Sequence, residues 1–461
     1  MSLRRCLLPF TFLPLLALAC APHADSHAKA PTVGELHQLA ERDSKQTSAW
    51  YLAELVSPDG NPERAKKARA ALEKAKATDL LAELGRGIDD FAHGHLKQAP
   101  EHMMRAVQAA RESDDPRAPL LGWYAARQAI GFRANDPKLW DRWKPFVQKV
   151  LNDPGRLGFR ARAELADWAL SEAYADGEKD LRSLATKLRG CVPDVRLAGP
   201  FGRNAAPDLL RSFPAEAPGA WPARFPVEAG QGEPPRLLAT TRTGCAIESK
   251  EPMPGGVYYA ETFVTVTRPT ELLVWAGRAL RIWVDDTTVL AHDVRDWGTW
   301  TNVAAGVAVG AGRHRVLVEV TQPSAEIRLL SRDGRPLGAA TDSDGSKPYA
   351  LPRPDALAVN EVAHYVSKDG IRDPKDDLLR FVLANLAAED GGADVASALI
   401  EPLVADPARA TGISLAAAAR FTDGDPIYEN SQRRDLVRQL NERAAKRDAE
   451  LWSPRLSLGL W

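Results

Sequence analysis

Three histidines in the first third of the chain have types and a spacing that suggest metal chemistry. His93, His95 and His102 lie in a stretch whose apolar spacing predicts a helix hairpin, and imidazole nitrogens arranged in this way approach a zinc geometry. No cysteine or carboxylate is placed to complete a four-ligand set. The alternative is that the three side chains lie at a solvated helix end. The sequence favours this alternative and predicts no metal site.

A second group of candidate ligands is acidic. Asp285 and Asp286 are followed by His292, Asp293 and Asp296, and calcium collects several carboxylate oxygens. The alternative is that the Asp-Asp pair forms the turn of a β-hairpin, because aspartate tolerates the left-handed backbone of such turns. The pair directly follows a predicted strand, so the turn is favoured.

The segment Asp296-Trp297-Gly298-Thr299-Trp300 places two tryptophans around a glycine. An aromatic face offers a large contact area and stacks on a sugar ring or a peptide. The alternative is that one or both indoles pack against the neighbouring strands and fix the loop. Trp297 and Trp300 are therefore the candidate ligand-binding residues.

Motifs of enzyme families are missing from the sequence. It contains no Gly-x-Ser-x-Gly, no His-Glu-x-x-His, no phosphate-binding Walker loop and no Rossmann fingerprint. Carboxylates are too numerous to single out one acid–base pair of the glycosidase type. We therefore expect no catalytic residue and no cofactor.

The N-terminus has the features of an export signal. Arg4 and Arg5 precede a short apolar stretch that ends at Leu18, well below the ~20 apolar residues that span a bilayer. The run Leu16-Ala17-Leu18-Ala19-Cys20 resembles a bacterial lipobox, which implies a signal peptide over 1–19 and a diacylglycerol on the Cys20 thiol. The alternative is an ordinary secretory signal that is cleaved nearby. Residues 20–31 are polar and predict a flexible tether.

The lipobox resemblance implies a lipid-anchored protein of the bacterial cell envelope, at the outer membrane, facing the periplasm or the cell surface. In an exported chain the remaining cysteines, Cys191 and Cys245, favour a disulfide. The alternative is a nucleophilic cysteine, which needs a neighbouring histidine base that the local sequence does not offer.

Residues 32–190 predict one helix after another. Asn61-Pro62 and Asp136-Pro137 are helix starts, and successive helix pairs begin at a spacing of about 39 residues, as in an α-solenoid. One stretch resembles a tetratricopeptide repeat through Leu84-Gly85, Phe91, Gly94, Ala99, Met103 and Ala106. The alternative is a generic helical bundle.

Residues 191–340 alternate apolar and polar positions between turn signals, which predicts an antiparallel β-sandwich. Several of its segments resemble a galactose-binding-like jelly roll: 197–201, 213–216, 259–266, 280–286 and 312–320. Calcium-dependent sugar-binding relatives carry an Asp-Asp pair before the strand that corresponds to 280–284. Here that place is Ala276-Gly277-Arg278, so the resemblance implies no calcium site.

Residues 341–355 are rich in Gly, Pro, Asp and Ser and predict a linker, and 356–461 predict a second helical-repeat segment. Leu456, Leu458, Leu460 and Trp461 find no following helix that would bury them. We expect that the chain continues into a longer protein or that its end docks on a partner. The alternative is that this end folds back into its own groove.

The fold class expected is α+β multidomain: an α-solenoid, an antiparallel β-sandwich and further helical repeats. The charge is balanced, with 60 Lys+Arg against 61 Asp+Glu among 461 residues, which argues against a nucleic-acid partner. We expect a lipid-anchored scaffold that binds envelope proteins or peptides. One alternative is a carbohydrate-binding module that uses Trp297 and Trp300, with glycans as partners. Another is the non-catalytic front end of a longer transglutaminase-like or peptidase-like enzyme, as in large exported proteins that this chain resembles.

Overall fold

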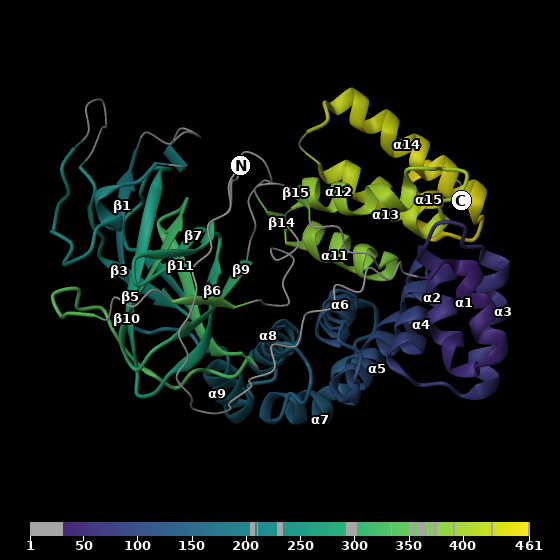
Figure 1. The fold of residues 1–461 in the computed structure, drawn as a ribbon, viewed down its shortest axis with the longest axis horizontal. Coiled ribbons are helices and arrows are strands. Elements are labelled where there is room, and N and C mark those ends of the chain that lie inside the picture. The colour runs from purple at the N-terminus through teal and green to yellow at the C-terminus, as the bar shows by residue number, and fades with distance from the viewer. Residues whose placement is uncertain are drawn as a thin grey trace, which may run out of the picture.

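The computed structural model describes residues 31–202, 208–209, 211–227, 234–291, 302–332, 334–349, 354–357, 366–367, 370–371, 376–390, 392–425 and 427–459. Figure 1 shows an α+β architecture in which helices come first, two antiparallel sheets follow, and further helices complete the chain. No helix in the described part of the chain is long and apolar enough to cross a membrane.

The first helical segment starts from local capping signals. Thr32 and Glu35 form a reciprocal capping box at the first helix, and Asn61 caps a helix whose first residue is Pro62. Tyr51, Trp123 and Trp168 are among the side chains buried where the helices pack. The helices are α1 (Val33–Arg42), α2 (Thr47–Val56), α3 (Pro62–Ala75), α4 (Leu80–Ala92), α5 (Gln98–Glu112), α6 (Ala118–Gly131), α7 (Leu139–Asn152), α8 (Phe159–Ala175) and α9 (Lys179–Leu188).

The two sheets face each other across an apolar core and neither closes into a barrel within the described residues. The first sheet has the order β2-β1-β5-β10-β7-β8, with β12 also paired to β5, and the second has the order β13-β9-β6-β11-β4-β3. The strands are β1 (Arg196–Phe201), β2 (Arg236–Leu237), β3 (Thr240–Thr243), β4 (Ala246–Ser249), β5 (Val257–Val266), β6 (Thr270–Gly277), β7 (Ala279–Val284), β8 (Thr287–Ala291), β9 (Asn302–Val309), β10 (Gly312–Val320), β11 (Ser324–Ser331), β12 (Ala340–Asp342) and β13 (Asp355–Leu357).

The segment between the sheets and the last helices differs from the predicted linker. β12 pairs with β5 and β13 pairs with β9, so strands of the sheets bound the residues predicted as a linker over 341–355. A two-stranded hairpin, β14 (Val366–Ser367) and β15 (Gly370–Ile371), follows. Within the described part of the predicted second helical segment over 356–461, the first helix begins at Asp377, where Asp376 caps the first turn.

The last helices return to the first ones and pack beside them (Figure 1). The Ser414 hydroxyl donates to the Val56 carbonyl at 2.7 Å, and the Asp59 amide donates to the Arg409 carbonyl at 2.7 Å. The two helical segments therefore pack against each other. The sheets contact the first segment at α8. The helices are α11 (Asp377–Glu389), α12 (Ala393–Val404), α13 (Gly412–Gly424), α14 (Asn430–Arg447) and α15 (Trp452–Leu458).

The sheets rest on α8 through a small apolar cluster. Phe159 packs edge-on against Trp275, with ring centroids 6.0 Å apart, and Leu273 and Leu330 belong to the same buried group. The Arg160 guanidinium lies 4.5 Å from the centre of the Trp275 ring, a cation–π contact that adds to apolar burial.

Candidate functional site

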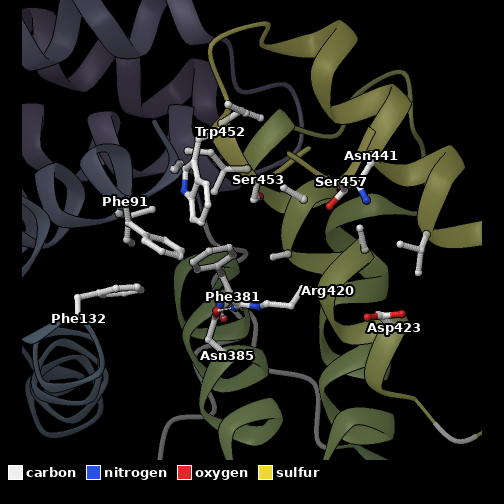
Figure 2. Close-up of a pocket in the computed structure, with 18 of the residues that line it drawn as sticks. Phe91, Phe132, Phe381, Asn385, Arg420, Asp423, Asn441, Trp452, Ser453 and Ser457 are labelled. Carbon is white, nitrogen blue, oxygen red and sulfur yellow. Dashed lines mark hydrogen bonds between the residues drawn. The ribbon is translucent and has the colours of Figure 1, made fainter. Parts of the chain in front are cut away.

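A cavity of about 460 Å³ lies between the two helical segments, within the range of sites that bind small ligands or side chains. It forms where α4 and α6 of the first segment face α11, α13, α14 and α15 of the second (Figure 2). The lining residues are Ile88, Phe91, Ala92, Tyr124, Phe132, Phe381, Asn385, Ile413, Ala416, Ala417, Ala419, Arg420, Asp423, Val437, Asn441, Leu451, Trp452, Ser453 and Ser457.

One wall of the cavity is aromatic. The rings of Phe91, at the end of α4, and Phe132, directly after α6, have centroids 4.5 Å apart. Trp452, at the start of α15, meets Phe91 edge-on with centroids 6.2 Å apart, and Phe381 of α11 faces the same space (Figure 2). Both helical segments therefore contribute to this wall, and the return of the second segment to the first completes it.

The polar lining of the cavity includes side chains without hydrogen-bond partners among the described residues. Asn441 is 4% exposed and Tyr124 is 3% exposed, and neither side chain has a hydrogen-bond partner within the described residues. The buried indole nitrogen of Trp452 also lacks one there. The Trp452 nitrogen is enclosed, whereas the polar atoms of Asn441 and Tyr124 are open to solvent at the cavity and are available to a ligand.

The charges at the cavity balance. Arg420 and Asp423 are both exposed residues of α13 and have opposite charge. Arg420 donates to the side-chain oxygen of Asn385, whose amide nitrogen donates to the Phe381 carbonyl at 2.8 Å.

Burial raises the pKa of the Tyr124 hydroxyl, which therefore stays protonated and able to donate.

A second cavity of about 390 Å³ adjoins the first and contains His93. The His93 imidazole lies between two carboxylates, with Nδ1 2.9 Å from Asp89 and Nε2 3.0 Å from Asp448. Burial lowers the pKa of His93, but hydrogen bonds to Asp448 and Asp89 outweigh it and raise the pKa to about 10. His93 is thus a cation that ties α4 to the end of α14.

The carboxylates on both sides of His93 are ionised. Burial raises the pKa of Asp89, but hydrogen bonds from His93, Tyr51 and Arg69 outweigh it and lower the pKa to about 2. For Asp448 the hydrogen bond from His93 likewise overcomes burial and lowers the pKa. The cluster is therefore a buried ion-pair network rather than an acid–base pair poised near neutral pH.

The three histidines do not converge on one point. His95 pairs with Asp90 at 3.2 Å and His102 pairs with Glu83 at 2.7 Å, whereas His93 pairs with Asp89 and Asp448. The predicted position at a solvated helix end is correct for His95, whose side chain is 57% exposed. It is wrong for His93 and His102, whose side chains are 15% and 17% exposed. The carboxylates that the sequence pattern did not reveal explain the difference.

Among the described residues, one set of potential metal ligands occurs, and it lies in the second cavity. Ligand atoms of His93, Asp448 and Glu450 lie within 4.8 Å of one another. Each is already paired, because Asp448 binds the imidazole and Glu450 lies 3.2 Å from the ammonium of Lys66. This set is satisfied as ion pairs.

The Asp-Asp pair forms a hairpin turn, as the sequence favours. Asp285 and Asp286 have φ angles of 47° and 62° and join β7 to β8, as in a type I′ turn. The carboxylate of Asp285 accepts from His314 at 2.6 Å and that of Asp286 accepts from Arg315 at 2.7 Å. Both carboxylates are therefore used within the fold.

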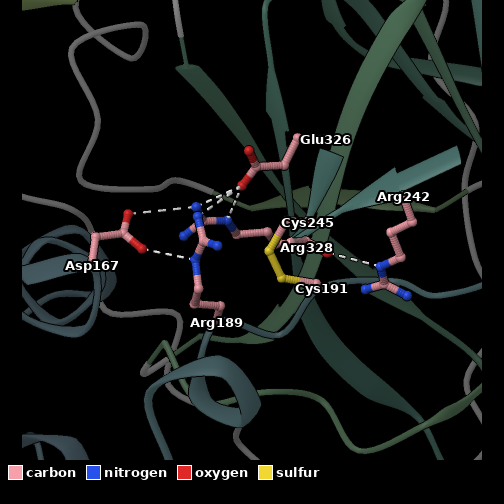
Figure 3. The surroundings of a disulfide bond; sticks show 8 residues. Asp167, Arg189, Cys191, Arg242, Cys245, Glu326 and Arg328 are labelled. Carbon is pink, nitrogen blue, oxygen red and sulfur yellow. Dashed lines mark hydrogen bonds and ion pairs between the residues drawn. A yellow bond between two sulfur atoms is a disulfide. The ribbon is translucent and has the colours of Figure 1, made fainter. Parts of the chain in front are cut away.

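The remaining candidate residues have different outcomes. Cys191 and Cys245 are joined by a disulfide with Cα atoms 5.2 Å apart, within the usual range. The disulfide lies beside the ion pairs that Asp167 forms with Arg189 and Arg328 (Figure 3). The other predicted features lie outside the described residues. They are the signal peptide, Cys20, His292, Asp293, Asp296, Trp297, Trp300, Leu460 and Trp461.

The described end of the chain is only partly covered. Leu456 is 56% exposed and Leu458 is half-buried, while Leu451 is fully packed and Trp452 lines the cavity. The beginning of α15 therefore folds onto the chain's own helices, while its outer side leaves apolar surface in solvent.

Local sequence patterns do not reveal the cavity. Its residues come from six helices, and Phe91 and Trp452 belong to opposite ends of the chain. One available signal was Asn441, which lies four positions after Val437 and three before Ala444 and so shares the apolar side of its helix. Comparison of the chain with known protein families, curated proteins and solved structures finds no match.

Proposed function

We propose that this protein is a lipid-anchored scaffold of the bacterial cell envelope that binds segments of partner proteins between its two helical segments. The observation that carries the proposal is the cavity of about 460 Å³ with an aromatic wall and two lining side chains, Asn441 and Tyr124, that lack hydrogen-bond partners in the described chain. Such a site is complementary to a partner with apolar and hydrogen-bonding parts.

We further propose that the first helices are tetratricopeptide-like repeats of a solenoid and that the sheets are a galactose-binding-like jelly roll. Close helix packing at small residues supports the first assignment, because a side chain at Gly85 would meet Tyr51 and one at Gly87 would meet Met103. The two facing antiparallel sheets support the second. Solenoids offer extended surfaces to partners.

The proposed role is binding and not catalysis. Two serines, Ser453 and Ser457, line the cavity. Neither is hydrogen-bonded to a histidine or carboxylate within the described residues, and an activated serine needs such a base.

Selection from a displayed peptide library tests the proposal. Ala416→Phe fills the cavity from α13, and Ala445→Phe places the same side chain on α14, where the partly buried alanine does not line the cavity. We expect peptides selected on the natural protein to bind Ala445→Phe unchanged and Ala416→Phe at least tenfold more weakly. Circular dichroism and thermal melting check that both variants fold. Equal binding to both, or no enriched peptide, refutes the proposal.

A further inference from the structure

We infer that the cavity between the helical segments is a specificity pocket for one bulky apolar side chain of the partner together with the adjoining main-chain amide. This inference rests on the proposed function and specifies which part of a partner the site recognises. It follows from the unpaired polar groups, the aromatic wall and the balanced charge of the lining.

Asn441 is a buried side chain whose carboxamide lacks a hydrogen-bond partner among the described residues. Its carboxamide offers one acceptor and two donors, yet it is 4% exposed and unpaired in the described part of the chain. In Figure 2 its side chain projects from α14 toward the cavity, near Ser457. A peptide unit presents one N–H and one C=O, which together match a carboxamide. A main-chain amide in the cavity would therefore satisfy Asn441.

Tyr124 adds a hydrogen-bond donor at the same cavity. Its hydroxyl donates in the protonated form and has no partner within the described residues. A carbonyl oxygen accepts two hydrogen bonds, so the carbonyl of a peptide provides the acceptor that this donor needs. The Trp452 indole nitrogen is enclosed and does not reach solvent.

The aromatic wall determines the side chain that fits. Phe91, Phe132 and Phe381 present ring surface to the cavity, and aromatic pairs add geometric preference to the burial of apolar area. The opposite charges of Arg420 and Asp423 leave no net charge among the described lining residues. An uncharged apolar or aromatic side chain is therefore favoured over an acidic or basic one.

A sugar fits the cavity less well than a peptide. Each hydroxyl of a sugar ring requires a hydrogen-bond partner when it is buried. Most of the lining residues, including Ile88, Ile413 and Val437, are apolar and provide none. The apolar side chain of a peptide would instead bury against them, while its main chain occupies the polar end.

Saturation-transfer NMR with the whole protein tests the inference. The probes are N-acetyl-L-phenylalaninamide, N-acetylglycinamide, which lacks the side chain, and methyl α-glucoside, which represents sugars. The variants are Asn441→Leu, which keeps the size but removes the hydrogen bonds, and Tyr124→Phe, which removes one hydroxyl. Ala445→Phe is the control because it does not line the cavity.

We expect the phenylalanine probe to bind the natural protein and Ala445→Phe, and to bind Asn441→Leu at least tenfold more weakly and Tyr124→Phe severalfold more weakly. The melting temperature of Asn441→Leu should not fall, because the lost amide has no partner in the described chain. A purely structural role would lower the melting temperature and leave binding unchanged. No binding of the phenylalanine probe, equal binding to Asn441→Leu, or stronger binding of the glucoside refutes the inference.

The outcomes separate this inference from the proposed function. Selected peptides that need an open cavity but bind Asn441→Leu normally would leave the proposed function standing and refute the pocket described here. Absence of any cavity-dependent peptide, together with probe binding that depends on Asn441, would refute partner binding alone.

Discussion

Replacement of His93 by glutamine removes the cation that joins the two helical segments. In the structure its imidazole lies 2.9 Å from Asp89 and 3.0 Å from Asp448, and its side chain is 15% exposed. The gap between a pKa of about 10 and the ordinary value of 6.5 corresponds to at most about 5 kcal/mol. Solvent contact and the remaining Arg69–Asp89 pair reduce the expected loss to about 2 kcal/mol at pH 7.

The pH dependence of this effect has a definite sign. Because folding raises the pKa of His93, its stabilisation is complete below pH 6.5, falls as the pH rises, and is lost above about pH 10. Urea unfolding followed by circular dichroism at pH 6, 8 and 10 measures the difference between His93→Gln and the natural protein. His95→Gln is the matched control, since its side chain is 57% exposed, and should cost less than about 0.5 kcal/mol. A difference that grows with pH, or equal losses for both variants, would refute the reasoning.

The remaining predictions concern the anchor, the disulfide and the tryptophan loop. Mass spectrometry of membrane-extracted protein should find diacylglycerol on Cys20, and an unmodified terminus beyond it would count against the lipid anchor. Alkylation without reductant should find no free thiol at Cys191 or Cys245, and Cys245→Ser should cost about 2–4 kcal/mol of unfolding free energy; labelling of both thiols would contradict the pairing. If Trp297 and Trp300 bind sugars, a glycan array should show binding that the double alanine variant loses, and an array without any binding removes that alternative.

Local signals in the sequence predict much of the fold. The strand expected over 280–284 is β7 (Ala279–Val284), and the helix expected after Asn61 is α3 (Pro62–Ala75). Alternation of apolar residues and helix caps act over a few residues, so they predict elements and their order. The hairpin turn at Asp285 was predictable for the same reason, because turn preference is a local property.

The candidate site was not predictable, because it depends on contacts between distant parts of the chain. Asp448 lies 355 positions from His93, and the Ser414–Val56 hydrogen bond spans 358. The spacing of the histidines alone suggests a metal site or a solvated helix end, because the carboxylate that binds the imidazole lies far away in the sequence. The return of the last helices to the first ones creates both cavities.

Hydrogen–deuterium exchange with a selected peptide bound tests most directly whether partners occupy the cavity between the helical segments. We predict slower exchange in α13 (Gly412–Gly424) and α15 (Trp452–Leu458) on binding, with β5 (Val257–Val266) unchanged. The protection should disappear in Ala416→Phe and persist in Ala445→Phe. Protection confined to the sheets, or protection of α13 that survives in Ala416→Phe, would contradict this account.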